Sequence, residues 1–309
     1  MTDVGVVVMA YGTPRTPDEI LPYYTDIRRG RPPTDEQLAD LTRRYAAIGG
    51  TSPLAARTEA QRAAIAAALG DGFRVVLGLK HADPKIEAAV DGLAAAGVER
   101  VVGVVLAPQF SAFSVGEYLG LMTASAQRHG MTSRGVRSWA TEPAFVEFVA
   151  ADVRSKLAAM PAGTFVLFTA HSLPRRIIDA GDPYPGELRA TAAAVASAAG
   201  LADDRWDTAW QSAGRTPEPW LGPDVLEAID GLAAEGRPGV LVSAVGFVAD
   251  HLEVRYDLDI EARQRAVGRD IAFERTACVN DDTAVMAALA RRVADVAVDV
   301  AADVEVEPG

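Results

Sequence analysis

The sequence predicts an α/β fold built on parallel sheets, and two features of the chain support this prediction. Short apolar runs rich in valine recur along the 309 residues, each bounded by polar or glycine-containing segments. Segments long enough for a helix separate these runs. Parallel strands need crossovers of that length, whereas antiparallel strands can be joined by a tight turn. The runs contain few polar residues, as expected of strands that are buried on both faces.

Strand-like and helix-like segments alternate along the whole chain. Strands are expected where apolar and β-branched residues run together, at Val4–Ala10 and at residues 73–77, 101–107, 136–139, 165–170, 206–210 and 240–244. Helices are expected in the longer segments, at residues 17–27, 35–45, 54–69, 84–96, 118–128, 143–160 and 283–297. This order gives right-handed crossovers and sheets flanked by helices.

The two halves of the sequence resemble each other locally. The string VVMAYGTP at residues 7–14 aligns with LFTAHSLP at residues 167–174, so Tyr11 and His171 stand at equivalent positions after a strand. Further along each half, VVLAPQFSAFSVGEY parallels VLVSAVGFVADHLEV. We therefore expect two similar α/β halves that face each other across a cleft. Loops at the strand ends line this cleft, with Tyr11 and His171 on opposite walls.

Composition excludes several classes of protein. A formal net charge of −12 argues against a general nucleic-acid binder, because phosphate backbones need a basic surface. No apolar run approaches the roughly 18 residues of a membrane span, and the first residues lack the basic region of a secretory signal. Cys278 is the single cysteine, which rules out a disulfide framework within the chain. We expect a cytoplasmic protein with a sizeable core and two domains.

Carboxylates recur after the strand at residues 240–244. Glu253, Asp257 and Glu261 are spaced by four residues, and this spacing places side chains along one face of a helix. Their mutual repulsion is unfavourable unless solvent or a cation relieves it, and His251 stands close by as a further ligand. The segment is therefore either a divalent-metal site at a strand end or a solvated acidic face.

A basic cluster stands out against the acidic background. Arg28, Arg29 and Arg31 lie close together, with Arg43 and Arg44 soon after them. Guanidinium groups pair with carboxylate or phosphate through two parallel hydrogen bonds. The cluster indicates either a small anionic ligand or an ordinary charged surface patch.

Longer motifs add a family resemblance that covers nearly the whole chain. They are MAYGTP, YYTDIRRGR, RRYAAIGGTSPL, GLKHADP, LAPQFSAFSVGEY, TAHSLP, GDPYP, WQSAGRTPEPWLGPDV and VGFVADHLEVRYD. In these motifs the chain resembles ferrochelatase, and the coproporphyrin-using branch in particular. The resemblance implies the chelatase-like fold, with two Rossmann-like domains and a porphyrin cleft between them.

The resemblance also implies an activity and a domain division. The activity is that of a lyase that inserts ferrous iron into coproporphyrin III, giving iron-coproporphyrin III for haem biosynthesis. We expect an N-terminal domain over residues 1–140 and a C-terminal domain over residues 141–282 that carries the metal-inserting groups. The final helix, at about residues 283–298, is expected to pack back on the first domain.

The matching motifs imply roles for individual residues. His171 and Glu253 match the metal-inserting pair, and Tyr11 matches the tyrosine that approaches iron from the other face of the macrocycle. Further matching positions line the porphyrin site and hold its propionates: Arg28, Arg44, Tyr45, Ser52 and Tyr118. Asp257 and Glu261 match an acidic ladder that passes metal towards Glu253. In the family, this segment is a π-type helix.

The residue types suit the implied chemistry. Insertion of a divalent ion expels two pyrrole protons, so the site needs a base near the ring centre. A neutral imidazole such as that of His171 can accept a proton or hold a metal, and a carboxylate such as that of Glu253 can do both as well. The arginine cluster matches the four propionates of coproporphyrin III.

Expected cofactors and partners are few. Fe²⁺ is expected as a substrate, with no tightly bound cofactor, and one cysteine cannot ligate an iron–sulfur cluster within the chain. We expect a monomer that binds coproporphyrin III and iron, inserts into no membrane, binds no nucleic acid and contacts neighbouring haem-pathway enzymes transiently. His81 and His251 are compatible with the cleft or with helix capping.

Other functions stay open. A chelatase for another tetrapyrrole or metal is one, such as insertion of iron into protoporphyrin IX, or of cobalt or nickel, since His and carboxylate ligands accept most divalent first-row ions. A non-catalytic porphyrin or haem carrier is another, and it would be favoured if His171 and Glu253 lay far apart. A nucleotide-binding Rossmann enzyme is disfavoured, because no Gly-x-Gly-x-x-Gly turn follows Val4–Ala10 or residues 165–170.

Overall fold

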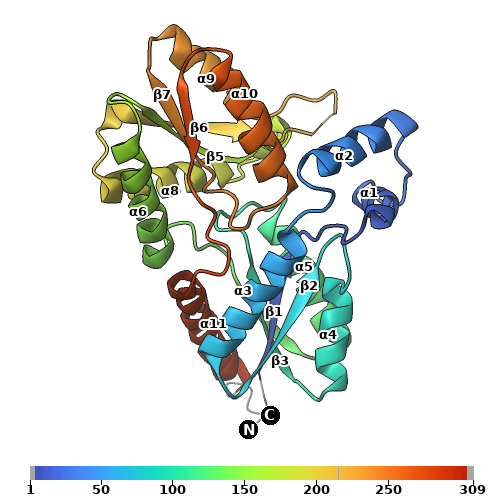
Figure 1. Ribbon diagram of the computed structural model, residues 1–309. Coiled ribbons are helices and arrows are strands. Elements are labelled where there is room, and N and C mark those ends of the chain that lie inside the picture. The colour runs from blue at the N-terminus through green and yellow to red at the C-terminus, as the bar shows by residue number, and fades with distance from the viewer. Residues whose placement is uncertain (1–3, 215, 305–309) are drawn as a thin grey trace. The chain divides into compact units, whose positions relative to one another are not determined.

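A computed structural model describes residues 4–214 and 216–304 of the chain, with side chains described up to residue 298 (Figure 1). Its strands form two separate four-stranded sheets in which every pairing is parallel. The first sheet has the order β2 (Phe73–Leu79), β1 (Val4–Ala10), β3 (Arg100–Val105), β4 (Thr132–Val136). All seven residues of β1 are buried, as expected of a central strand covered on both faces.

The second sheet repeats the arrangement of the first. Its order is β6 (Trp206–Gln211), β5 (Phe165–His171), β7 (Gly239–Ser243), β8 (Ala272–Arg275). In each sheet the first strand in sequence is central, with the second strand on one side of it and the third and fourth on the other. β1, which Tyr11 follows, and β5, which ends in His171, are therefore topologically equivalent, as the local repeat predicts. The predicted α/β class with parallel sheets is confirmed.

The described residues form two compact units. The first contains the residues up to Ala107, Ala112–Trp139 and the residues from Asn280 onward. The second contains Pro108–Ser111 and Ala140–Val279. The short segment Pro108–Ser111, which follows β3, thus belongs to the second unit, whereas the sequence prediction placed it in the first domain.

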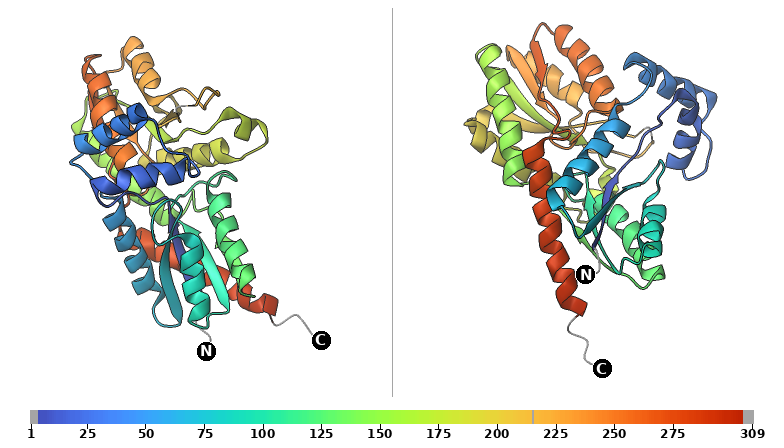
Figure 2. Two further views of the ribbon diagram at one scale, coloured as in Figure 1. Left: turned by 90° about the vertical axis from the view of Figure 1, so that its right-hand side faces the viewer. Right: turned by 60° about the horizontal axis from the view of Figure 1, so that its bottom comes forward.

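Each unit includes the helix that follows the last strand of the other. Helix α6 (Pro143–Ala159) comes after β4, yet it packs against α8 (Tyr184–Ala199) and β7 of the second unit. Helix α11 (Thr283–Val304) comes after β8, yet it packs against α3 (Leu54–Leu69) and the β3–β4 edge of the first sheet. Figures 1 and 2 show the red α11 running beside the blue α3.

The other helices of the first unit follow β1, β2 or β3 along the chain. They are η1 (Pro17–Glu19), α1 (Ile20–Ile27), α2 (Asp35–Ala47), α4 (Ile86–Ala95) and α5 (Val115–Arg128). Helix α2 begins with a capping box, in which Thr34 and Gln37 satisfy each other's backbone N–H groups. This cap fixes the start of α2. No helix in the described parts of the chain combines the length and apolar content that crossing a membrane requires.

The second unit has short helices around its sheet, and one of them is unusual. They are α7 (Arg175–Asp179), η2 (Asp203–Arg205), α9 (Val225–Ala234), η3 (Val254–Ala262) and α10 (Arg263–Val267). η3 is a π-helix of nine residues, although π-helices are rare and mostly limited to a single turn at functional sites. α10 continues η3 directly in the ordinary α form.

The apolar residues of η3 determine which of its faces points inward. Val254, Leu258 and Ala262 are fully buried and belong to the core formed with β7 and α9. Each of the three carboxylates of the acidic ladder stands one residue before one of them. Burial of this apolar face therefore holds the carboxylates along its edge, where Asp257 is buried and Glu253 and Glu261 are half-buried.

Candidate active site

His171 is the last residue of β5 and is held in one orientation. Its ring atom Nδ1 donates a hydrogen bond to the backbone carbonyl of Ser172 at 2.6 Å. The other ring nitrogen, Nε2, then faces Glu253, with 3.5 Å between Nε2 and Oε1. Because a carbonyl oxygen can only accept, Nδ1 carries a proton, and the state of Nε2 decides the charge of the imidazole.

A close backbone approach brings Glu253 to His171. The loop after β7 crosses β5 at Gly246, whose N–H donates to the carbonyl of Thr169 at 3.0 Å. A side chain at position 246 would meet Ala170 at 2.5 Å, so glycine is required for this crossing. The loop then reaches Glu253 beside the end of β5.

A second imidazole contacts Glu253. The atom Nε2 of His251 lies 3.5 Å from Oε2, so each carboxylate oxygen of Glu253 faces a different histidine. His251 is held by donation from Nδ1 to the carbonyl of Ala249 at 2.9 Å, and its ring packs on Phe247 with centroids 4.9 Å apart. The sequence left two roles open for His251, in the cleft or as a helix cap. In the structure His251 belongs to the same cluster as His171 and Glu253.

The electrostatics of the pair follow from burial and mutual attraction. Burial disfavours the imidazolium of His171, yet the adjacent carboxylate of Glu253 outweighs it and raises the pKa of His171 to about 9. Burial likewise opposes ionisation of Glu253, but the charge and hydrogen bond of His171 hold the pKa of this carboxyl well below its usual range. At neutral pH the metal-free pair is thus an imidazolium beside a carboxylate, and the proton between them can be displaced by a cation.

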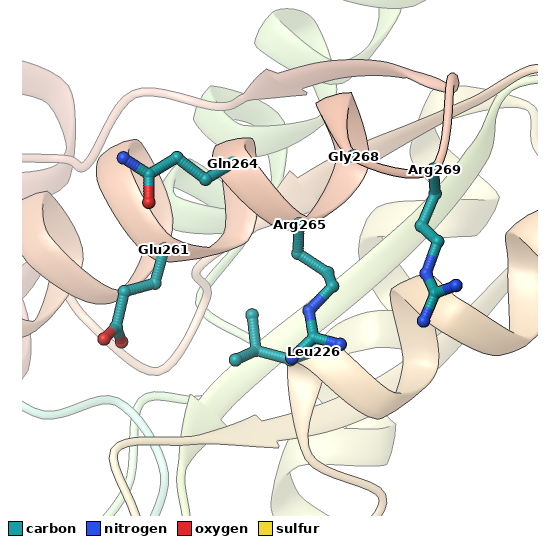
Figure 3. Close-up of a pocket in the computed structure, with 6 residues that line it drawn as sticks. All are labelled: Leu226, Glu261, Gln264, Arg265, Gly268 and Arg269. Carbon is teal, nitrogen blue, oxygen red and sulfur yellow. The ribbon is translucent and has the colours of Figure 1, made fainter.

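The rest of the acidic ladder extends away from this pair. Asp257 accepts a hydrogen bond from the hydroxyl of Ser212 at 2.5 Å. Glu261 lines a pocket of about 470 Å³ on the surface of the second unit, together with residues of α9 and α10. In Figure 3, Glu261 and Arg265 hang from the same side of the helical segment, and Arg265 pairs with Asp230 at 3.0 Å. The ladder therefore runs from a surface pocket to the His171–Glu253 pair.

The carboxylates do not converge on one point. Within residues 4–214 and 216–298, no group of three or more His, Cys, Asp or Glu side chains is placed to hold a metal ion. Three of the four predicted metal residues (Glu253, Asp257 and Glu261) lie in succession along η3 and its start, and the fourth, His171, lies at the end of β5. Their role towards metal stays a prediction.

In the first unit, Tyr11 follows β1 and lies over a histidine. Tyr11 is 42% exposed, and its ring packs on the ring of His81, with centroids 4.5 Å apart. His81 contacts Asp26 through Nδ1 at 2.7 Å, and Lys85 pairs with the other oxygen of the same carboxylate at 2.9 Å. Burial lowers the pKa of His81, an effect that Asp26 opposes. Tyr11 thus rests on a fixed imidazole at the carboxyl end of the first sheet.

Three other residues predicted to bind the ring are buried and already make contacts within the first unit. Tyr118 is buried in α5 with the ammonium of Lys80 5.3 Å from its ring centroid, and burial raises its pKa well above the ordinary value. The hydroxyl of Tyr45 shares a hydrogen bond of 3.2 Å with Thr13 in the interior. The hydroxyl of Ser52 accepts from the N–H of Leu54 at the start of α3.

The two predicted ring-binding arginines are half-buried. Arg28 ends α1, with its guanidinium 5.8 Å from the ring centroid of Tyr24 and its Nε donating to the carbonyl of Arg31. Arg44 lies in the last turn of α2. Both keep solvent-accessible surface that a propionate could reach, and their role in binding stays a prediction.

Comparison with known proteins decides the family. The ferrochelatase family model matches residues 3–297. The chain belongs to the ferrochelatase family. It is 46% identical over 269 residues to the coproporphyrin III ferrochelatase of Halalkalibacterium halodurans (84% of this chain and 86% of the relative), and 47% identical over 271 residues to that of Geobacillus kaustophilus (84% and 85%). The resemblance seen in the motifs is confirmed.

Solved structures support the fold of this ferrochelatase-family protein. The structure of SirB from Bacillus subtilis with Fe³⁺ matches with a TM-score of 0.58 and 11% identity, covering 96% of this chain and 95% of that one. The structure of CbiX, from denitrifying bacteria, matches with a TM-score of 0.55 and 16% identity, covering 95% and 98%. At such identities the similarity shows the fold alone, and it confirms the chelatase-like α/β architecture.

Sequence reasoning missed Ser212, the residue that holds Asp257. Ser212 follows β6, whose last residue pairs with His171 across the sheet, and its backbone has the positive φ of 59°. A residue other than glycine in this conformation is under local strain, which is common at functional sites. The string WQSAG contains Ser212, but nothing in that string indicates a left-handed backbone at a serine.

The pKa of His171 can be tested in the metal-free protein. In the variant Glu253→Gln we expect this pKa to fall from about 9 towards 6.5 or below, because burial is then no longer opposed by an adjacent carboxylate. Imidazole NMR signals followed against pH measure it. The surface variant Glu235→Gln, which removes the same charge from the same unit, should leave the titration unchanged. A titration that stays near 9 in Glu253→Gln would contradict the assigned origin of the shift.

Proposed function

We propose that this protein inserts ferrous iron into coproporphyrin III, giving iron-coproporphyrin III in haem biosynthesis. The observation that carries the proposal is the pair of His171 and Glu253, whose nearest side-chain atoms lie 3.5 Å apart at the end of a buried strand. The coproporphyrin III ferrochelatases that match over most of the chain support the same substrate. We also propose that the protein acts in the cytoplasm as a monomer, without a tightly bound cofactor.

The pair supplies a proton acceptor and a metal ligand together. In the metal-free state, His171 holds the proton that Glu253 attracts. When Fe²⁺ reaches Glu253, its positive charge favours loss of that proton and leaves a neutral imidazole, which can take up a pyrrole proton. Across the reaction one Fe²⁺ enters the ring and two protons leave it. Glu253 and His171 are the groups that we assign to these transfers.

The porphyrin is assigned to residues of the first unit. Arg28 and Arg44 supply guanidinium groups for propionates, and Tyr11 is the tyrosine assigned to a face of the ring. Contacts at the periphery of the ring can stabilise the bent macrocycle that metal entry requires, which is binding to the activated geometry. Each unit thus contributes one kind of group, with anion binding in the first and metal handling in the second.

The acidic ladder is assigned to metal delivery, and a charge-removing variant tests this role. Asp257→Asn combined with Glu261→Gln should raise the Fe²⁺ concentration needed for half-maximal rate and leave the dissociation constant for coproporphyrin III near its wild-type value. The reason is that both side chains lie along η3 and neither is assigned to the propionates. Anaerobic initial rates against Fe²⁺ and fluorescence titration with the porphyrin measure the two quantities.

The matched control for the ladder is Asp203→Asn with Glu235→Gln. Both residues are exposed on the second unit, and this variant removes the same charge from its surface. It should change neither quantity. If the ladder variant weakened porphyrin binding alone, the carboxylates would be structural or part of the ring site.

A non-catalytic porphyrin carrier on the same fold is the second candidate. It has no need for an imidazole and a carboxylate in contact at a strand end, and this contact disfavours it. Turnover separates the two functions. The protein would be mixed anaerobically with Fe²⁺ and coproporphyrin III, at a protein concentration far below that of the porphyrin. We expect each protein molecule to form many equivalents of iron-coproporphyrin III. Binding that stops at one equivalent, with no product beyond the spontaneous rate, would support the carrier and contradict the proposal.

A further inference from the structure

Arg275, at the end of the edge strand β8, makes the most extensive ionic contacts near η3. Its guanidinium meets Asp259 through two parallel hydrogen bonds, from Nε to Oδ1 at 2.7 Å and from Nη2 to Oδ2 at 3.0 Å. Nη2 also lies 3.3 Å from Oδ1 of Asp250, and Nη1 donates to the carbonyl of Thr276 at 2.9 Å. The arginine side chain is 14% exposed and that of Asp250 is 13% exposed.

The two aspartates lie on either side of Glu253. Asp250 precedes Glu253 by three residues in the loop that also carries His251, whereas Asp259 lies within η3 between Asp257 and Glu261. One guanidinium therefore joins the loop that delivers Glu253 to the helix that begins there. Since Arg275 itself extends from β8, which pairs with β7, both parts are tied to the sheet.

Apolar packing alone does not fix the position of η3. The buried residues Val254, Leu258 and Ala262 determine which face of the helix is inward, but apolar attraction is non-directional and permits small shifts along the axis. A π-helix is also a rare conformation that needs support from the surrounding structure. The planar fork of an arginine bonded to a carboxylate through two atoms supplies directional support, which a lysine ammonium cannot do.

Net stability is a poor explanation for this ionic cluster. The loss of hydration on burying an arginine and aspartates offsets much of their attraction, so such clusters add little free energy of folding compared with apolar residues. The pKa of Arg275 illustrates the balance, because burial lowers it while Asp259 and Asp250 outweigh that effect and raise it. The cluster therefore matters for the geometry of the segment that carries Glu253, more than for the free energy of folding.

We propose that Arg275 is a positioning residue for metal insertion, which through Asp250 and Asp259 fixes Glu253 and His251 against the end of β5. The proposal rests on the proposed function for its kinetic consequence. Its structural consequence, the ordering of residues 250–262, can be measured without any substrate. Arg275 and both aspartates lie in the second unit, so the account involves contacts of that unit only.

The first test is Arg275→Lys, which keeps the positive charge and loses the planar fork. We expect kcat for iron insertion to fall roughly 10–100-fold, as for misplacement of a catalytic group by about 1 Å. The dissociation constant for coproporphyrin III should stay within about twofold of wild type, because the residues assigned to the propionates lie in the first unit. The matched control, Arg189→Lys, alters an arginine–aspartate pair on the surface of the same unit and should change neither quantity.

The second test asks whether Arg275 acts through Asp259. Asp259→Asn should lower kcat in the same direction, and the double variant with Arg275→Lys should be no slower than Arg275→Lys alone, because residues that act as one unit are non-additive. Asp259→Asn also keeps the proposal testable if Arg275→Lys does not fold. Multiplicative effects on kcat would mean that Arg275 acts by another route and would overturn the proposal.

Hydrogen exchange of the substrate-free proteins gives a readout independent of activity. In Arg275→Lys we expect faster amide exchange across residues 250–262, with exchange in the strands of the first unit unchanged. If the wild-type protein inserted no iron, the proposed function would fail, yet this measurement would still decide whether Arg275 orders the segment. Unchanged exchange there, or unchanged kcat in a folded Arg275→Lys protein, would overturn the positioning role.

Discussion

Replacing His171 by alanine should lower the rate of iron insertion by roughly 10²–10⁴-fold, the usual contribution of a general base. The reason is geometric: Nδ1 is fixed by the carbonyl of Ser172, so Nε2 is the ring atom left to exchange protons near Glu253. Binding of coproporphyrin III should remain measurable, since His171 has no assigned role in holding propionates. Anaerobic initial rates and porphyrin fluorescence titration measure the two effects.

A matched control for this variant is His129→Ala. His129 ends α5 in the first unit and contacts Asp91, with a ring that is 36% exposed. Its replacement removes an imidazole without touching the assigned site, so the insertion rate should stay close to wild type. Retention of more than about a tenth of wild-type activity in His171→Ala would contradict the assignment of His171 as the base, given the size of that contribution.

Coproporphyrin III should be preferred to protoporphyrin IX by at least about tenfold in kcat/KM, which corresponds to about 1.4 kcal/mol. Coproporphyrin III carries four propionates and protoporphyrin IX two, with vinyl groups in place of the others. The guanidinium groups assigned to the propionates would have fewer propionates to bind in the second substrate. Each lost charge-assisted contact is worth about 1.5–3 kcal/mol where water is excluded and much less where solvent reaches the pair.

The variant Arg28→Ala tests which substrate uses the arginine. It should narrow the preference, because it removes a contact that the four-propionate substrate makes and the two-propionate substrate lacks. Arg128→Ala is the control and should leave the preference unchanged: Arg128 ends α5 in the first unit, pairs with Asp91 and has a side chain that is 55% exposed. Equal kcat/KM for both porphyrins in the wild-type protein would contradict the assignment to coproporphyrin and leave family membership untouched.

The central strands and the edge strands β2 and β6 could be predicted from the sequence, whereas the edge strands β4 and β8 could not. β1 is an unbroken apolar run and β5 begins with four apolar residues, as expected where helices cover both faces of a parallel sheet. β8 has the sequence AFER, which is short and half charged as an edge strand permits, so no apolar run marks it. β4 ends at Val136, while residues 136–139 were expected to be a strand. Trp139 lies outside the strand and is buried, and its indole N–H donates a hydrogen bond to the carbonyl of Val105.

The candidate site shows a similar division. The spacing of the three carboxylates predicted a common face, and the buried residues that follow each of them explain why. The π form of η3 was implied by the family resemblance alone, since apolar spacing does not distinguish it from an α-helix. The contacts of Arg275 could not be predicted, because they join residues 16 and 25 positions apart whose distance depends on the packing of β8 against β7.

The initial rate of iron-coproporphyrin III formation tests the central claim most directly. The protein would be mixed anaerobically with Fe²⁺ and an excess of coproporphyrin III, and product would be followed by absorbance beside His171→Ala and Glu253→Gln at equal concentration. The account predicts many turnovers by the wild-type protein, with both variants slower by roughly two orders of magnitude or more. A wild-type rate no greater than that of iron and porphyrin alone would contradict it, as would variants that keep the wild-type rate.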